Sequence, residues 1–411
     1  MRCSDESSMG RSRRSFLKYA SMAVAAGPVM SEGLLARAAA AQAAGTTKKG
    51  PADDAFAATV YPAGAVQIDA NENPMGPSKG ALKAIAEVAV TGGRYDAFNE
   101  ADKLQQTFAA QHGLSKDSVM VYAGSSEPLH FTVLAFTGPD KPFVTADPSY
   151  EAGMYGAMMA KAPIFKVKLT PEYAHDVKGL VAASPNAGVI YICNPNNPTG
   201  TITAKKDILW ALDNKPAGTI LLVDEAYIHL SDAEDVLDQV AAGKDLIVLR
   251  TFSKVYGMAG LRCGLACGRP DLLKKLRAYG VNPMVITGAA AANASLAEPE
   301  LVPTRKKIIG DIRVETITWL KENNYKVIGE SQSNCFMIDA GRPGKGVIKA
   351  MQAKNVYIGR TWPVWPNAVR ITVGSKEDMV KFKKAWKEVM DAPPVVAEVR
   401  TPKKRDGVVV A

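Results

Sequence analysis

The sequence predicts an α/β fold, in which a large domain with a mostly parallel central sheet is followed by a smaller α+β domain. From about residue 118, short apolar runs alternate with segments of helical periodicity, and this alternation is typical of a parallel sheet covered by helices. After residue 301 the pattern changes to a long helix followed by closely spaced strands and helices. The chain has 411 residues, which is too many for one hydrophobic core, so we expect at least two domains.

The elements of the larger domain are predicted from these apolar runs. Ile220–Val223 is apolar at every position, which is typical of a strand buried on both faces. A helix should begin near Glu127, because Pro128 suits its first turn. By the same criteria we expect strands at 118–122, 142–146, 189–193, 220–223, 246–249 and 263–266, and helices at 127–136, 150–160 and 205–212.

The smaller domain is predicted from the C-terminal part of the pattern. We expect helices at 301–323, 347–354 and 376–390 and strands at 336–339, 356–358 and 369–373. The segment at 52–98 should complete this domain. We therefore expect a large domain at 99–300 and a small domain at 301–392.

The N-terminus has the three parts of an export signal. A basic stretch with paired arginines, Arg11–Lys18, precedes a weakly apolar stretch, Tyr19–Met30, and an Ala-rich run with A-x-A sites follows. Paired arginines before a weakly apolar segment indicate the twin-arginine type. We therefore expect residues 1–43 to be a twin-arginine signal peptide and the mature protein to be periplasmic, with a disordered basic tail as the alternative interpretation.

Charge and hydropathy argue against two classes of partner. The formal net charge is +9, but residues 1–43 and 400–411 each carry a net +3, so the body between them keeps only +3. A nucleic-acid-binding protein would concentrate basic charge on its folded surface, so we expect no nucleic-acid partner and a solvated basic tail at 393–411. No run reaches the roughly 18 apolar residues of a membrane-spanning helix, so we expect no membrane attachment after processing.

Cysteine and histidine spacing predicts neither a disulfide nor a metal site. Cys263 and Cys267 are four residues apart in a predicted strand, about 13 Å, which exceeds the reach of a disulfide. The four histidines have no partner at metal-ligand spacing.

Polar residues follow several predicted strands at the point where each strand ends. Gly124, Asn197, Asp224 and Lys254 each come just after an apolar run. Because ligands of parallel sheets bind at the carboxyl ends of the strands, we expect these residues to share one site. Taken singly, each has a simpler explanation: an aspartate after a strand is commonly a helix cap, and a lone lysine is commonly solvated. Their joint occurrence in this order favours a site.

The motifs around these residues form a specific set that spans residues 65–390. They are Asn71-Glu72-Asn73-Pro74, Gly124-Ser125-Ser126-Glu127, Asn196-Asn197-Pro198-Thr199-Gly200, Asp224-Glu225-Ala226-Tyr227, Ser253-Lys254, Gly260-Leu261-Arg262-Cys263-Gly264 and Arg370-Ile371-Thr372-Val373-Gly374. As a set they resemble the pyridoxal-phosphate (PLP) aminotransferases of fold type I, and within them the histidinol-phosphate aminotransferase family. The resemblance implies an aminotransferase that moves an amino group from an amino acid or a histidinol-phosphate-like amine to a 2-oxo acid such as 2-oxoglutarate.

The resemblance also implies roles for the residues around the cofactor ring. Lys254 is the amine that binds the PLP aldehyde covalently, and Asp224 is the carboxylate that keeps the pyridine nitrogen protonated. Asn197 and Tyr227 correspond to hydrogen-bond donors to the ring 3-oxygen, and Tyr150 corresponds to an aromatic side chain stacked on the ring. Lys254, Asp224 and Tyr227 are thus the expected catalytic residues.

The phosphate of the cofactor is assigned by the resemblance to the helix N-terminus after Gly124, where free N–H groups favour an anion. The side chains expected to bind it are Ser125, Ser126, Ser253 and Arg262. Tyr95 matches a family tyrosine that reaches the phosphate of the neighbouring subunit. We therefore expect a homodimer, with the segment at 52–98 contributing to its interface.

The substrate contacts implied by the resemblance are Arg370, Arg360 and Asn73. Arg370 corresponds to the arginine that binds an anionic group of the substrate, whereas Arg360 has a surface arginine as its alternative interpretation. Trp362 and Trp365 depart from the family pattern; they either pack the small domain or line the pocket for the donor side chain.

Two other functions are weighed against transamination. One is a PLP-dependent lyase or decarboxylase, because one fold supports several bond cleavages. The other is a binding protein that has lost the chemistry, but such a protein would have replaced the lysine, the aspartate or the phosphate arginine, and all three are present. The expected export also argues against a role in histidine biosynthesis, whose intermediates are cytoplasmic, so the donor stays open.

Overall fold

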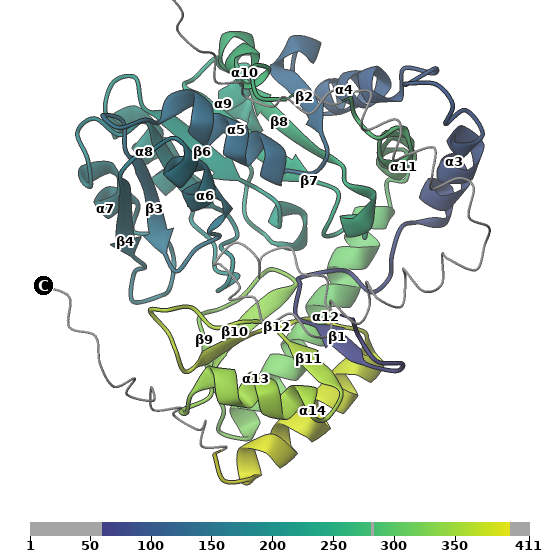
Figure 1. The fold of residues 1–411 in the computed structure, drawn as a ribbon, viewed down its shortest axis with the longest axis vertical. Helices are drawn as coiled ribbons and strands as arrows, with labels where there is room; N and C mark the ends of the chain where they lie inside the picture. The colour runs from purple at the N-terminus through teal and green to yellow at the C-terminus, as the bar shows by residue number, and fades with distance from the viewer. Residues whose placement is uncertain (1–59, 281–282, 395–411) are drawn as a thin grey trace, which may run out of the picture. The chain divides into compact units, whose positions relative to one another are not determined.

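The structure is a computed structural model that describes residues 60–280 and 283–394 (Figure 1). The predicted signal peptide at 1–43 and nearly all of the basic tail at 393–411 lie outside the described residues. From Tyr61 onward the chain forms one compact unit. Within the described ranges, none of the helices combines the length and the apolar character needed to cross a bilayer.

A seven-stranded sheet forms the centre of the larger part of this unit, with the strand order β2-β8-β7-β6-β5-β3-β4. The strands are β2 (Val119–Tyr122), β3 (Phe143–Asp147), β4 (Ile164–Lys168), β5 (Val189–Cys193), β6 (Ile220–Asp224), β7 (Leu246–Thr251) and β8 (Gly264–Gly268). Neighbouring strands are parallel except where β8 pairs with β2 and β7. The predicted mostly parallel sheet is confirmed.

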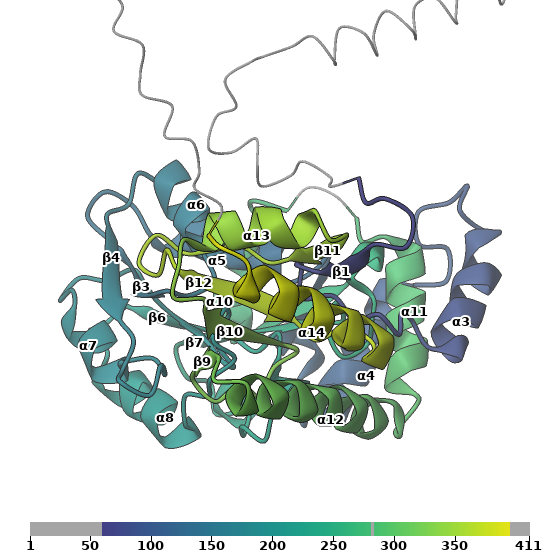
Figure 2. The ribbon, with the colours of Figure 1, turned by 90° about the horizontal axis from the view of Figure 1, so that it is seen from below.

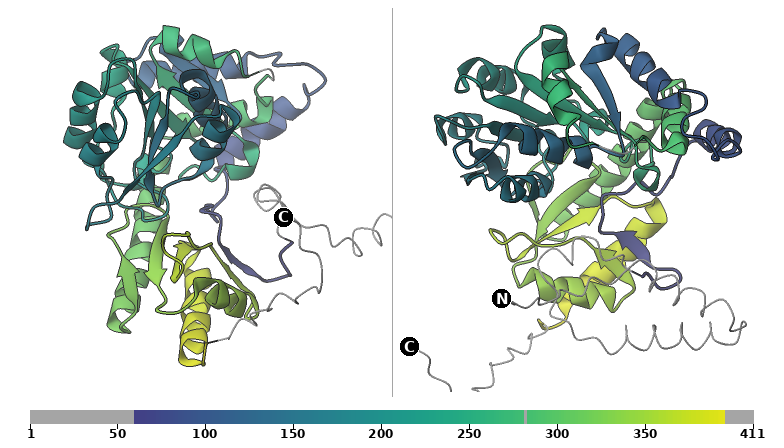
Figure 3. Two further views of the ribbon diagram at one scale, coloured as in Figure 1. Left: turned by 60° about the vertical axis from the view of Figure 1, so that its left-hand side comes forward. Right: turned by 45° about the horizontal axis from the view of Figure 1, so that its top comes forward.

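Helices cover both faces of this sheet, as the two views of Figure 3 show. One face packs on α5 (Ser126–Phe136), α6 (Ala152–Met159) and α10 (Pro270–Leu276). The other face packs on α4 (Glu100–Gln111), α7 (Val177–Ala182), α8 (Lys205–Asn214), α9 (Leu237–Ala241) and α11 (Ile286–Leu296), and α3 (Lys79–Ala89) packs against α11.

The central strands are apolar throughout because successive residues enter different cores. Along β5, Ile190 and Ile192 belong to one core, whereas Tyr191 and Cys193 belong to the other. This alternation follows from the two-residue period of a strand. Because of the same alternation, every second side chain at the ends of β5 and β6 points toward the same side of the sheet.

The smaller part contains the C-terminal elements α12 (Leu301–Glu322), β9 (Lys326–Ile328), β10 (Cys335–Asp339), α13 (Gly344–Gln352), β11 (Val356–Ile358), β12 (Ala368–Thr372) and α14 (Lys376–Asp391). Strands β12, β10 and β9 form an antiparallel sheet. The early strand β1 (Val66–Ile68) pairs in parallel with β11, and both lie against α14 (Figure 2). The chain therefore enters the smaller part first, and an α+β arrangement is confirmed there. The division at 99–300 and 301–392 stays a prediction.

Some elements differ from the sequence-based expectations. The elements that were not predicted are strands β1, β4 and β9 and helices α3, α4, α7, α9, α10 and α11. Strand β4 lies at the sheet edge and alternates apolar residues with lysines, so it lacks the continuous apolar run of the central strands. The helix predicted at 150–160 begins at Ala152, which leaves Tyr150 in the segment before it. The strand predicted at 263–266 begins at Gly264, so Cys263 precedes it.

The described cysteines are four buried free thiols, at positions 193, 263, 267 and 335. The described residues also contain no cluster of three or more histidine, cysteine, aspartate or glutamate side chains placed to hold a metal ion.

Candidate active site

A cavity of about 480 Å³ lies at the carboxyl ends of the central strands. Cys193, Asp224 and Thr251, the last residues of β5, β6 and β7, all line it. The predicted site residues that the fold brings to its wall are Ser125, Ser126, Tyr150, Asn197, Asp224, Tyr227, Ser253, Lys254, Arg262, Arg360 and Arg370. Their sequence separation shows that tertiary structure, rather than local proximity, assembles the cavity.

Asp224 supplies a buried carboxylate at the end of β6. Its Oδ2 accepts a hydrogen bond of 3.0 Å from the Tyr191 hydroxyl, and its Oδ1 accepts one of 3.1 Å from the Ala226 N–H. Burial raises the pKa of Asp224 to about 6, although both hydrogen bonds and the charge of Lys254 oppose this shift. A carboxylate in this setting is suited to pair with a cationic N–H group in the cavity.

Lys254 supplies an amine that is neutral more often than an ordinary lysine. Its Nζ donates a 2.9 Å hydrogen bond to the carbonyl oxygen of Asn71 and lies 5.4 Å from the centre of the Tyr227 ring. Burial, and next the positive charge of Arg370, lower the pKa of Lys254 to about 8. A neutral amine is the form that attacks an aldehyde or accepts a proton.

Hydroxyl groups, a guanidinium and a helix N-terminus form the opposite end of the cavity. Arg262 donates to the carbonyls of Ala123, at 3.2 Å, and Ala259, at 2.8 Å, and lies 3.5 Å from the Ser253 hydroxyl. Gly124 has a φ of +91°, and a Cβ there would lie 2.1 Å from Nη2 of Arg262, so only glycine fits. Helix α5 begins directly after, with Ser125 and Ser126 at its N-terminus. This arrangement suits a phosphate group.

Two arginines from the smaller part line the same cavity. Arg370, in β12, donates a 3.0 Å hydrogen bond to Oδ1 of Asn197 and another to the carbonyl of Asp69, while its buried Nε has no hydrogen-bond partner. Arg360 forms an ion pair with Glu151, and its guanidinium lies 4.5 Å from the centre of the Trp362 ring. Because its oxygen accepts from Arg370, Asn197 keeps its amide NH₂ as the donor of its side chain.

The remaining predicted contacts do not line this cavity. Tyr95 is 87% exposed between α3 and α4. Asn73 is buried, and its amide donates to the backbone carbonyls of Lys254, at 3.1 Å, and Val255, at 2.9 Å, so it holds the lysine segment in place. The roles predicted for Tyr95 and Asn73 toward phosphate and substrate stay predictions.

The two tryptophans belong to side-chain packing rather than to the cavity wall. Trp362 is fully buried beside Met337 and Ala368, and Trp365 packs its ring edge-on against Tyr173. Trp362 thus lies behind Arg360 and supports it. Neither residue lines the cavity: Trp362 packs within the smaller part, as one of the two interpretations expected, whereas Trp365 packs against Tyr173 of the larger part.

Two further residues of the site were missed by the sequence analysis. Asn71 donates from its amide to the Tyr227 hydroxyl at 2.9 Å, besides accepting from Lys254. Tyr191 is the hydrogen-bond partner of Asp224. The available signals were weak: Asn71 begins the motif Asn71-Glu72-Asn73-Pro74, and Tyr191 is a polar aromatic residue inside an otherwise apolar strand.

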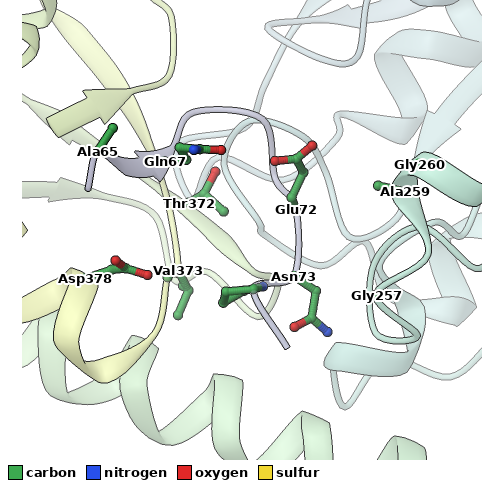
Figure 4. Close-up of a pocket in the computed structure, with 12 residues that line it drawn as sticks. Ala65, Gln67, Glu72, Asn73, Gly257, Ala259, Gly260, Thr372, Val373 and Asp378 are labelled. Carbon is green, nitrogen blue, oxygen red and sulfur yellow. The ribbon is translucent and has the colours of Figure 1, made fainter. Parts of the chain in front are cut away.

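A second cavity of about 380 Å³ lies beside the first, and Glu72 lines both. Figure 4 shows Glu72 and Asn73 on the segment that crosses it, with Asp378 and Gly257 on its other walls. A Cβ at Gly257 would lie 2.1 Å from the Gly76 carbonyl oxygen, so the loop after Lys254 packs tightly on the segment that carries Asn73.

The residues of the main cavity fit the cofactor that the motifs imply. The amine of Lys254 suits its aldehyde, the buried carboxylate of Asp224 suits its ring nitrogen, and the end formed by Gly124 and Arg262 suits its phosphate. All three groups open into one cavity, as a single bound molecule requires.

Comparisons with known proteins agree with this geometry. Residues 64–385 match the family described as aminotransferase class I and II. An aromatic amino acid aminotransferase from Nocardia farcinica is 33% identical over 82% of this chain and 94% of its own length. A histidinol-phosphate aminotransferase from Moorella thermoacetica is 28% identical over 79% of this chain and 85% of its own.

The solved structures show the same fold. The crystal structure of a protein described as a putative histidinol-phosphate aminotransferase, from Erwinia carotovora atroseptica, is 30% identical, has a TM-score of 0.76 and covers 81% of this chain and 99% of its own. The Sinorhizobium meliloti histidinol-phosphate aminotransferase in complex with pyridoxal-5′-phosphate is 24% identical, has a TM-score of 0.74 and covers 85% of this chain and 99% of its own. Since one family matches most of the chain and the cavity carries the groups its cofactor needs, this chain belongs to the class I and II aminotransferases and is a PLP-dependent aminotransferase.

Proposed function

We propose that the amino donor is an amino acid whose α-carboxylate binds Arg370, and that the acceptor is a 2-oxo acid such as 2-oxoglutarate. The observation that carries this proposal is the position of Arg370, which lines the same cavity as Lys254 and has a buried Nε without a hydrogen-bond partner. A guanidinium pairs with a carboxylate through two N–H groups, which orients the donor as well as binding it.

The residues of the cavity then divide the work of the reaction. Bound PLP supplies an electron sink that makes the Cα–H bond of the donor acidic. Lys254 removes the Cα proton with its neutral Nζ and later returns it, and Asn71 holds that nitrogen through its carbonyl oxygen. Arg370 orients the donor by its carboxylate, and Asp224 keeps a proton on the nitrogen that it faces.

The relatives narrow the choice of donor. They include proteins named aromatic amino acid aminotransferase and histidinol-phosphate aminotransferase. Both names describe donors with a flat ring in the side chain, so we expect a ring-bearing donor here. The binding sites for these two kinds of donor differ in charge. The phosphate of histidinol phosphate needs a cationic partner, which the side chain of an aromatic amino acid does not need.

A panel of amino donors tests this proposal. The mature holoenzyme is assayed with phenylalanine, tyrosine, histidine, aspartate and histidinol phosphate, with 2-oxoglutarate as the acceptor. We expect an oxo product and glutamate in equal amounts from at least one amino acid. Released carbon dioxide or ammonia would instead support the lyase or decarboxylase alternative, and reaction with histidinol phosphate alone would contradict the amino acid donor.

We also propose that the protein is a homodimer. Tyr95 is exposed, and the neighbouring Val90 and Phe98 are exposed apolar side chains, so this surface is suited to be covered by a second copy. Sedimentation of the holoenzyme tests the dimer. Tyr95→Phe should weaken PLP binding without changing the dimer, because it removes only the hydroxyl proposed to reach the partner's phosphate.

We propose, finally, that the twin-arginine signal exports the folded holoenzyme to the periplasm. The paired arginines and the Ala-rich run support this. Replacing Arg13 and Arg14 by lysine should leave the full-length protein in the cytoplasm, whereas the parent protein should be recovered, shortened, from the periplasmic fraction. Recovery of both proteins in one compartment would contradict export by this route.

A further inference from the structure

We infer that Glu151 is a specificity-determining residue: by pairing with Arg360 at the cavity wall, it makes the site favour donors whose side chain carries no negative charge. The inference rests on the proposed function, because it concerns the side chain of a donor held through Arg370. It assigns to Glu151 a role that no sequence motif indicated.

The position of the ion pair relates it to the donor. Arg360 lines the cavity, and Glu151 directly follows Tyr150, which lines it too. The guanidinium of Arg360 forms the ion pair with the Glu151 carboxylate and lies over the Trp362 ring. Arg360 is therefore held from two directions, by charge and by an aromatic surface.

The other cations of the cavity already have partners or assigned places. Arg262 lies at the end that suits a phosphate, and Lys254 is the amine of the reaction. Arg370 is bonded to Asn197 and to the carbonyl of Asp69 and is proposed to bind the α-carboxylate. Among the residues that line this cavity, Arg360 is the cation left for the donor side chain.

The pairing with Glu151 sets what that cation can do. An anionic side chain that approaches Arg360 must displace the Glu151 carboxylate and is repelled by it. A neutral side chain leaves the ion pair in place. Because the Arg360 and Glu151 side chains are 51% and 21% exposed, water and salt screen the pair, so the expected selectivity is graded rather than absolute. An anionic acceptor such as 2-oxoglutarate can therefore still bind by displacing the Glu151 carboxylate from Arg360.

The Trp362 ring relates the positions of the two arginines that contact the donor. The Arg370 guanidinium lies 5.7 Å from the centre of the same ring, on which Arg360 also lies. Trp362 is fully buried, so both guanidiniums lie near a ring that is held in one position. A short dicarboxylate that binds Arg370 at one end can then meet Arg360 at the other, once Glu151 has been displaced.

A binding experiment tests the inference without requiring turnover. Glutarate and its monoamide, glutaramate, differ by one charge at one end and serve as probes for the holoenzyme in isothermal titration calorimetry. Glu151→Gln removes the competing charge and keeps the side-chain size. We expect it to raise the affinity ratio of glutarate over glutaramate roughly two- to fivefold. Arg360→Gln should lower the same ratio.

The controls separate this effect from a general change of charge. Glu388→Gln makes the same substitution in an exposed ion pair with Lys354, away from the cavity, and should leave the ratio unchanged. An unchanged ratio in Glu151→Gln, or an equal rise in Glu388→Gln, would overturn the inference, as would an Arg360→Gln protein that keeps the parent ratio. Failure of the proposed function would be recognised by a different result. No amino acid in the donor panel would react, while the affinity ratio of glutarate over glutaramate would still change in Glu151→Gln.

Discussion

The Nζ of Lys254 donates a 2.9 Å hydrogen bond to the backbone carbonyl of Asn71, a residue that lies 183 positions earlier in the chain. Asn71 also donates from its amide to the Tyr227 hydroxyl, and its φ of +53° is in the left-handed region. An asparagine tolerates that conformation better than most residues. One residue of the N-terminal segment thus positions two groups of the active site.

Substitution of Asn71 should separate its backbone role from its side-chain role. Asn71→Gly keeps the left-handed backbone accessible and removes the amide, whereas Asn71→Ala removes the amide and also strains the backbone. We expect both variants to lose activity and the alanine variant to be less stable than the glycine variant by about 1 kcal/mol. Chemical denaturation and steady-state kinetics measure the two effects. An alanine variant as stable as the glycine variant would contradict the strain argument.

Lys254→Ala should abolish transamination, because no other amine is placed to bind the cofactor covalently and move the Cα proton in the described cavity. Reduction with borohydride followed by peptide mass analysis should label Lys254 in the parent protein and no peptide in the variant. Lys244→Ala, which changes an exposed lysine paired with Asp213, is the control and should keep its activity and label. Retained activity in Lys254→Ala would refute the assignment.

The pKa of Lys254 predicts the pH dependence of PLP capture by the apoprotein. Burial, and then the charge of Arg370, lower this pKa to about 8. The reactive neutral amine is therefore the major form above about pH 8, and the capture rate should rise through that pH. Arg370→Gln removes the second cause, so the midpoint should move to higher pH in stopped-flow absorbance measurements. Arg269→Gln, an exposed arginine paired with Asp271, should leave the midpoint in place.

Tyr191→Phe should weaken PLP binding most strongly at mildly acidic pH. The Tyr191 hydroxyl stabilises the ionised form of Asp224, whose pKa burial raises to about 6. Removing that hydroxyl raises the pKa further, so a smaller fraction of Asp224 is ionised below neutral pH. We expect the acid limb of cofactor affinity to move to higher pH and the affinity at pH 6 to fall about tenfold. Tyr279→Phe, whose exposed hydroxyl bonds a backbone carbonyl, is the control.

Glu225→Gln should destabilise the fold rather than alter the chemistry. Glu225 and Arg250 form a buried ion pair at 2.7 Å, and both side chains are almost fully buried. Removing one charge leaves Arg250 paired only with the more exposed Asp235. We expect a loss of about 3 kcal/mol in the free energy of unfolding. Asp311→Asn, in an exposed pair with Lys307, should cost less than about 1 kcal/mol. Equal losses would contradict this expectation.

Local patterns in the sequence predicted most of the strands of the fold. Strands such as β5 and β6 are buried on both faces, so their apolar runs predicted their bounds to within one residue. The edge strand β4 was missed because one side of it faces solvent, which replaces the apolar run with lysines. The motifs pointed to Lys254, Asp224 and Arg262, which the fold brings to one cavity, because the expected chemistry demands particular residue types at particular strand ends.

The sequence by itself predicted the fold class, the cofactor and most of the residues that line the cavity, since these depend on residue type and on order along the chain. Only the tertiary structure decided which neighbours control those residues. Asn71 meets Lys254, Tyr191 meets Asp224, and Glu151 meets Arg360 across long stretches of chain. Such contacts depend on how strands and loops pack in space. Side-chain type alone does not specify which residues that packing brings together.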